Sequence, residues 1–186
     1  MTGFGRDVWV ANPNAQELER LSPPYTAIAE GIPLPARGAA AKRYADVAFG
    51  AGAVWVAGDR FDPTLWRVEH ERVVARIPLG FAPRAVAAGR DGVWVVDPRG
   101  AVVRVDPGTN EPVARLRVGR NPVSVAAGSG SVWVVNRGDG TVSRIDPRRN
   151  AVVKTISVGS DPLDVAAGLG SLWVVRAGTE SSAAAT

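Results

Sequence analysis

Imidazole and carboxylate side chains gather at one point of the chain, the segment VEHER at 68–72. Histidine can act as a general acid or base and can bind metals, but His70 is the only histidine and there is no cysteine. A metal site needs more nitrogen or sulfur ligands than this, and a hydrolytic triad needs a nucleophile within reach of its histidine. We therefore expect His70 to be a solvated turn residue, and we expect no catalytic residue, metal site or cofactor.

Arginine is the second candidate for chemistry, because it supplies 20 of the 22 basic side chains and the net formal charge is +4. A nucleic-acid groove would gather these charges into a patch or stripe. Arg20, Arg67, Arg104 and Arg144 instead recur at one position of an internal repeat, and the others are scattered without a Lys/Arg run. We therefore do not expect a nucleic-acid partner.

The internal repeat is marked by tryptophan. Trp55, Trp94, Trp133 and Trp173 each lie in a V-W-V or L-W-V core and are separated by 39, 39 and 40 residues, and Trp9 has the same surroundings. A period of about 40 residues is typical of propeller blades. One repeat therefore defines the elements that must position the polar side chains.

The unit at 121–159 divides into four strand-sized segments, 123–127, 131–135, 142–146 and 151–158. Turn chemistry separates them: Gly-Ser-Gly, a polar Asn-to-Gly segment, and the hairpin loop DPRRN, in which proline fixes φ and Asn150 tolerates a left-handed backbone. Four antiparallel strands in about 40 residues are one blade of a β-propeller, and a single blade cannot bury both of its faces. The fold class is predicted to be all-β.

This repeat resembles the YVTN/YncE-like propeller family, whose units carry a GxxP turn, a V-x-V-[TA]-N strand and a DGTVS-x-IDP hairpin. The matching residues are Gly119, Pro122, Asn136, the DGTVS segment at 139–143 and the IDP segment at 145–147. The resemblance implies a propeller fold and carries little information on function. Relatives of this kind are often exported or form extracytoplasmic sensor parts, which implies such a setting here.

Laying the repeat along the chain predicts one propeller domain over 1–176. It contains a partial blade at 5–33, blades at 44–79, 84–118 and 123–158, and a partial blade at 163–175, followed by a disordered tail at 177–186. These segments hold 17 strands, which is not a multiple of four. The sequence thus predicts about four to five blades in an incomplete or open ring.

The repeated tryptophans and arginines are expected to be structural. Each Trp of the series lies at the same position of an apolar strand, where packing between blades needs a large side chain. Trp66 lies off this register and is expected to be partly exposed. The repeated arginines are expected to reach an Asp of a neighbouring blade at the rim of the ring.

A ligand site is expected on the loop face around the central channel, which is formed by the loops after the second and fourth strands of each blade. These loops hold the least repetitive polar side chains, and function tends to lie on variable loops of a rigid scaffold. The predicted ligand-binding residues are Arg60, Arg84, Asp97, Arg99, Asn121, Asn136, Arg137, Asp161 and Asp164.

Three functions follow as hypotheses. The first is a non-enzymatic module that binds a protein or a small ligand on the loop face. The second is part of a larger propeller enzyme whose catalytic residues lie outside this chain. The streptogramin lyases resemble this fold and use two histidines and a glutamate around magnesium, which a chain with one histidine cannot supply.

The third hypothesis is self-association through the open edges and Trp-lined faces of the terminal blades. Membrane insertion is not expected, because no segment reaches the roughly 18 apolar residues of a spanning helix. The N-terminus also lacks the basic and apolar regions of a signal peptide.

Overall fold

The computed structural model describes residues 7–12, 17–24, 28, 30–34 and 44–177. These residues form 17 strands in five antiparallel sheets of two to four strands each. The first sheet is β1 (Val8–Asn12), β2 (Glu17–Leu21) and β3 (Glu30–Pro33), and the last is β16 (Pro162–Gly168) and β17 (Ser171–Arg176). The three sheets between them have four strands each.

The three complete blades are formed by consecutive strands. The second sheet contains β4 (Asp46–Gly50), β5 (Ala53–Ala57), β6 (Thr64–Glu69) and β7 (Arg72–Pro78). The third contains β8 (Val86–Gly89), β9 (Gly92–Asp97), β10 (Ala101–Asp106) and β11 (Glu111–Arg117), and the fourth contains β12 (Pro122–Gly128), β13 (Ser131–Asn136), β14 (Thr141–Asp146) and β15 (Ala151–Ser157).

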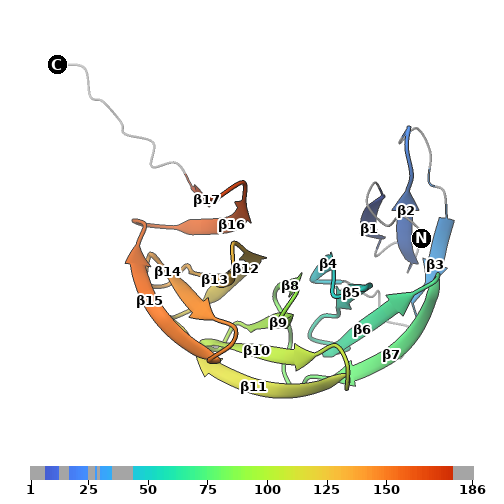
Figure 1. Cartoon of the computed structure of the whole chain (residues 1–186), viewed down its shortest axis with the longest axis horizontal. Helices are drawn as coiled ribbons and strands as arrows, with labels where there is room; N and C mark the ends of the chain where they lie inside the picture. Colours follow the sequence, from blue (N-terminus) through green and yellow to red (C-terminus); the bar gives the residue numbers. More distant parts are fainter. Residues whose placement is uncertain (1–6, 13–16, 25–27, 29, 35–43, 178–186) are drawn as a thin grey trace.

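The five sheets stand side by side in an open arc (Figure 1), with β4, β8, β12 and β16 on the inner side and β7, β11 and β15 on the outer side. The N-terminal and C-terminal sheets form the two ends of the arc and do not meet. The all-β, partial-propeller prediction is confirmed. The predicted tail, apart from Ala177, lies outside the described residues.

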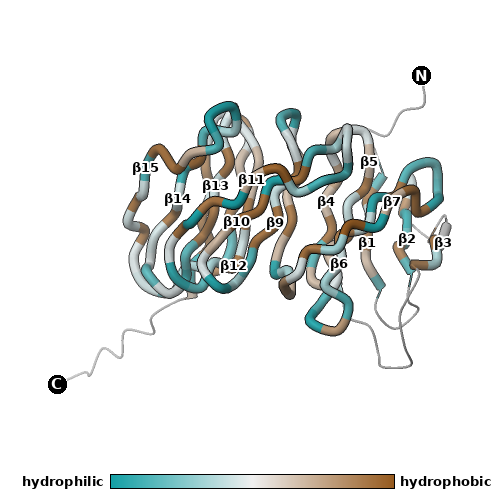
Figure 2. The backbone as a smooth tube through the Cα atoms, turned by 90° about the horizontal axis from the view of Figure 1, so that it is seen from below, coloured by the Kyte–Doolittle hydropathy of each residue, from teal (hydrophilic) through white to brown (hydrophobic). Residues whose placement is uncertain are grey.

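Local turn chemistry explains why each blade folds back on itself. In the loop between β14 and β15, the Asp146 carboxylate accepts hydrogen bonds from the backbone N–H groups of Arg148 and Arg149 at 2.9 and 3.2 Å. Asn150 closes the turn with a φ of 49°, which asparagine tolerates better than most residues. Hydrophilic turns lie at both ends of the strands (Figure 2).

The hydrophobic core lies between neighbouring blades rather than within one sheet. In the second and third sheets, the Trp-bearing face packs on the next blade: Trp55 contacts a cluster that includes Val93 and Val95, and Trp94 contacts one that includes Val132 and Val134. Trp55 and Trp94 are fully buried, which confirms the packing role expected for them.

Trp66 was expected to be partly exposed, and that expectation is wrong, because its side chain is only 1% exposed. It lies on the opposite face of the second sheet, opposite Val56 in the register of β5 and β6. There it packs in the cluster between the first and second sheets, with Tyr44 edge-on at 5.7 Å between ring centroids.

Three of the four repeated arginines, Arg20, Arg67 and Arg104, connect neighbouring blades, as expected, but their acceptors differ from the predicted Asp. Arg104 Nη1 donates to the carbonyl oxygen of Pro147 at 3.2 Å and to Asn150 Oδ1 at 2.9 Å, and Arg67 makes the same pair of contacts to Pro107 and Asn110. The aspartates of these turns are occupied by the turns' own backbone, so the carbonyl and the asparagine face the arginine instead. Arg20 follows the prediction most closely, with an ion pair to Glu71 of the next blade at 2.8 Å.

The two ends of the arc expose the faces that are buried at the internal junctions. Trp173 of β17 is 64% exposed and Val175 is 56% exposed. At the other end, Val8 and Val10 of β1 are 50% and 41% exposed. The described part of the chain contains no helix long and apolar enough to cross a membrane.

Candidate functional site

The inner strands and their loops enclose a cavity of about 1160 Å³ at the loop face, here called the channel mouth. Its lining comes from the inner strands β4, β12 and β16, from the loops after β5, β9 and β13, and from the loops that lead into β8 and β12. Arg60, Arg84, Asn121, Arg137 and Asp164, five of the nine predicted ligand-binding residues, line it. The structure thus brings together side chains that are up to 104 positions apart in the sequence.

Two carboxylates on the inner strands face this cavity from equivalent repeat positions. Asp46 of β4 accepts from the backbone N–H of Val47 at 2.8 Å and, through its other oxygen, from the N–H of Val86 in the next blade at 2.9 Å. Asp164 of β16 accepts from the N–H of Val165 at 2.8 Å and from the Ser124 hydroxyl of the preceding blade at 2.5 Å. Both carboxylates therefore hold neighbouring blades together while they line the cavity.

The surroundings of Asp46 in the cavity change the pKa of its carboxyl group. Burial raises this pKa above its ordinary value, and the negative charge of Asp164 adds to the increase, while the two backbone N–H groups act in the opposite direction. Tyr44, which also lines the cavity, has its pKa raised to about 12 by burial and by the charge of Asp62. The Tyr44 hydroxyl is therefore neutral at physiological pH.

Three arginines bring positive charge to the same cavity. Arg137 is ion-paired with Asp161 at 2.5 Å, and this pair raises the pKa of Arg137. Arg60 is exposed and lies 4.6 Å from the ring centroid of its neighbour Phe61. Within the described residues no ion pair is formed by Arg60 or by the exposed Arg84, so their guanidinium groups have donors available for a ligand.

The other four predicted residues do not line the channel mouth. Asp97 is fully buried, and its carboxylate accepts hydrogen bonds from Arg99 Nε and Nη2 and from Arg115. Burial alone would raise the pKa of Asp97, but these hydrogen bonds lower it below its ordinary value. Asn136 is also fully buried: its Oδ1 accepts from the N–H of Gly119, and its Nδ2 donates to Thr141 and Ser143. Asp97 and Asn136 end the second strand of their blades and fix the adjacent loops, and Asp161 contacts the cavity only through Arg137.

Sequence reasoning missed Asp46, Ser124 and Tyr44 as lining residues. The repeat contained a signal for two of them, because Asp46 and Ser124 occupy the position of the predicted Asp164. This position directly precedes a Val in the inner-strand segments YADVAFG, NPVSVAAG and DPLDVAAG. Tyr44 carried no such signal. Its position follows from its packing in the cluster between the first and second sheets, edge-on to Trp66.

The cavity combines paired and unpaired charges of both signs with a neutral phenol. Among the described residues, no group of three or more His, Cys, Asp and Glu side chains is arranged to hold a metal ion. The arrangement can bind charged groups of a ligand by hydrogen bonds and ion pairs. Guanidinium groups suit carboxylate or phosphate oxygens, and the inner-strand carboxylates suit ammonium groups.

No family model matches the chain, and no curated protein matches it. Solved structures do resemble it: hydrazine synthase of Kuenenia stuttgartiensis, at 14% identity and a TM-score of 0.71, over 87% of this chain and 48% of that one. Apo AztD of Citrobacter koseri is similar at 15% identity and a TM-score of 0.65, over 95% of this chain and 49% of AztD. BBS1N, solved in complex with ARL6DN, is similar at 14% identity and a TM-score of 0.68, over 86% of this chain and 52% of BBS1N.

The chain therefore spans about half the length of these three neighbours. Identities this low carry fold and no function. Together with the arc of four-stranded antiparallel blades, the similarities identify the chain as a β-propeller module.

Proposed function

We propose that the chain is a non-enzymatic recognition module of YVTN type, and that it binds a small zwitterionic ligand, such as an amino acid or a short peptide, at the channel mouth. The observation that carries this proposal is the cavity of about 1160 Å³ that holds Arg60 and Arg84 together with Asp46 and Asp164. Its size suits a ligand larger than a single ion. Its two signs of charge favour a ligand with both an acidic and a basic group.

The binding role is favoured over catalysis by the state of the polar groups. Both inner-strand carboxylates are held by backbone N–H groups or a serine hydroxyl. A general acid or base must exchange its proton with a substrate, and groups fixed in this way are better suited to holding a charge. His70 lies in the turn between β6 and β7, at the other end of the strands from the channel mouth.

The test is a thermal-stability screen against glycine, glutamate, arginine, dialanine, succinate and putrescine. We expect an amino acid or dialanine to raise the melting temperature, because a ligand that binds only the folded state stabilises it. The rise should disappear in the double variant Arg60→Ala/Arg84→Ala. It should persist in the control Arg148→Ala/Arg149→Ala, whose exposed arginines lie in the turn between β14 and β15.

A screen in which no zwitterion binds, or in which binding survives the loss of both channel-mouth arginines, would contradict the proposal. Binding of succinate or putrescine alone would also contradict it, since a single sign of charge would then be sufficient.

A second candidate function is association with another copy of this chain, and the exposure of Trp173 favours it. The face that carries Trp173 and Val175 corresponds to the face that Trp55 and Trp94 bury against the next blade. The face that carries Val8 and Val10 corresponds to the one that receives such a tryptophan at the internal junctions. Because the two ends of one arc lie apart (Figure 1), a second copy is the partner that offers the matching face.

Light scattering after gel filtration tests this candidate. We expect an oligomer that dissociates when Trp173 is replaced by Gln, with the melting temperature of each subunit retained. A wild-type chain that remains monomeric at high micromolar concentration would contradict it.

A further inference from the structure

A second cavity lies between the N-terminal sheet and the first complete blade, with a volume of about 400 Å³. Its lining includes Gly52 from the turn between β4 and β5 and Glu69, His70 and Glu71 around the turn between β6 and β7. The channel mouth uses the loops at the opposite ends of these strands. The two cavities are therefore separate, and we call the second one the first-junction pocket.

The other junctions are closed at the corresponding place by close contact between innermost strands. A Cβ atom added to Gly50, Gly89 or Gly128 would lie 2.9, 3.0 or 2.9 Å from the Cβ of an alanine in the next blade, namely Ala88, Ala127 or Ala167. Each alanine directly precedes the last residue of its inner strand. These pairs leave no room for a larger side chain on either strand.

At the first junction, this alanine position is occupied by Phe49. Phe49 pairs with Val54 in the register of β4 and β5, as Ala88 pairs with Val93 and Ala127 with Val132. The side chain of Phe49 is 46% exposed and lines the pocket. At this junction the small alanine of the other blades is thus replaced by an aromatic side chain that forms part of the pocket wall.

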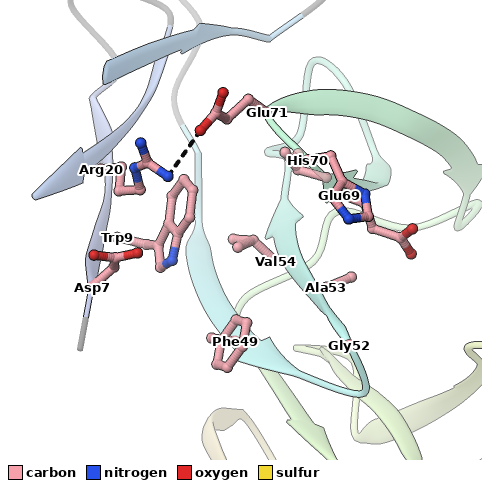
Figure 3. Close-up of a pocket in the computed structure, with 11 residues that line it drawn as sticks. Asp7, Trp9, Arg20, Phe49, Gly52, Ala53, Val54, Glu69, His70 and Glu71 are labelled. Carbon is pink, nitrogen blue, oxygen red and sulfur yellow. Dashed lines mark ion pairs between the residues drawn. The ribbon is translucent and has the colours of Figure 1, made fainter. Parts of the chain in front are cut away.

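The rest of the wall is apolar and comes from both sheets. Figure 3 shows Trp9 of the N-terminal sheet on one side of the space, with Phe49, Val54 and Ala53 of the next sheet on the other. Val54 and Val68 are almost fully buried and form the floor. A ligand with a flat or aliphatic body can contact two aromatic rings at once.

Among the described residues, acidic side chains predominate at the rim of the pocket. These residues supply the carboxylates of Asp7, Glu69 and Glu71 and one guanidinium, that of Arg20. Arg20 is ion-paired with Glu71 at 2.8 Å (Figure 3), and Glu69 is ion-paired with Arg67, which lies outside the lining. Asp7 accepts a hydrogen bond of 2.7 Å from the Ser22 hydroxyl through one oxygen. Aromatic faces and carboxylates both attract cations.

We propose that the first-junction pocket binds an organic cation with an apolar body, such as an arylalkyl ammonium group, with the body between Trp9 and Phe49 and the charge toward Asp7 and Glu69. This site is independent of the ligand proposed for the channel mouth. Its ligand needs no acidic group.

The test uses three probes of similar shape: benzylammonium, benzyl alcohol and benzoate. Dissociation constants are measured by chemical-shift titration of the ¹⁵N-labelled chain at low ionic strength. We expect benzylammonium to bind at least 5-fold more tightly than either other probe. Phe49→Ala should weaken it at least 5-fold, and Asp7→Asn should bring it to the affinity of benzyl alcohol.

Phe49→Ala places the alanine of the other blades at this position, so the fold should tolerate it, and the melting temperature checks this. Should Asp7→Asn lower the melting temperature through loss of the Ser22 contact, Glu69→Gln removes one rim charge in its place. Arg84→Ala, at the channel mouth, is the matched control and should leave benzylammonium binding unchanged.

Equal affinity for the three probes, absence of benzylammonium binding, or full affinity in Phe49→Ala would overturn the proposal. Failure of the zwitterion screen would not affect it, because the probes and the variants belong to different ends of the strands.

Discussion

Arg104 of β10 donates to the carbonyl oxygen of Pro147, 43 residues later in the chain and one blade further along the arc. Arg144 occupies the same position in the following blade and lies 5.4 Å from the ring centroid of Trp133. Its Nε donates to Ser131 of its own blade at 3.0 Å. Within the described residues, the next sheet consists of β16 and β17 and lacks the hairpin between third and fourth strands in which Arg104 finds its acceptors.

This difference predicts unequal costs for one substitution. Arg104→Met should lower the free energy of unfolding by about 1.5–3 kcal/mol, the range for hydrogen bonds to a charged group. Arg144→Met should cost at least ~1 kcal/mol less, because no contact between blades is lost. Urea unfolding followed by circular dichroism measures both, and equal losses would show that the contact between blades contributes nothing.

Asp97 predicts a specific response to acid. Its hydrogen bonds from Arg99 and Arg115 lower its pKa in the folded state, so its contribution to stability is complete above the unfolded pKa near 3.9 and is lost as the pH falls through the folded value. Asp97→Asn should cost about 1–3 kcal/mol at pH 7. Its stability should also fall less steeply than that of the wild type below about pH 4.

Denaturant titrations between pH 7 and pH 2 measure this response. Asp146→Asn serves as the control, since Asp146 lies on the half-exposed rim of a turn. Parallel pH profiles for wild type and Asp97→Asn would exclude the proposed role of the Asp97 carboxylate.

The hydrogen bonds of Asn136 predict that two substitutions at this position differ in their cost in stability. Asn136→Ala leaves the Gly119 N–H and two hydroxyls without their partner, and should cost about 1–3 kcal/mol. Asn136→Asp should cost less, because the hydroxyls of Thr141 and Ser143 can rotate and donate to a carboxylate. Thermal unfolding gives the ranking, and an aspartate variant as unstable as the alanine variant would contradict it.

The tryptophan series predicts a contrast between two residues of the same type. Trp94→Ala removes a fully buried side chain and should cost about 3–5 kcal/mol, whereas Trp173→Ala removes a mostly exposed one and should cost under about 1 kcal/mol in the monomer. Urea unfolding at a protein concentration where the chain is monomeric makes the comparison. A large loss in Trp173→Ala under those conditions would mean that its face is covered.

The strands, the repeat and the all-β class were predictable from the sequence because they follow from local chemistry. Alternation of apolar and polar residues defines a strand, and Gly, Pro, Asp and Asn define the turn that ends it, all within a few residues. The strand count of 17 and the burial of Trp55 and Trp94 follow from these patterns. Part of the site was accessible in the same way, since Arg60, Arg84 and Asn121 lie in loops that a propeller must bring to one face.

The other features of the site depend on how neighbouring blades pack against one another. Asp97 was predicted to bind ligand, but its carboxylate is turned inward by Arg115, 18 residues away, and Asp46 lines the cavity while it holds Val86 of the next blade. The sequence shows that Phe49 stands where the next blade has Ala88. Only the close packing of Ala88 on Gly50 in the structure shows that this position lies at a junction between blades. Contacts between blades join residues about 40 positions apart, and because their free energy depends on how two sheets pack, only the tertiary structure could assign them.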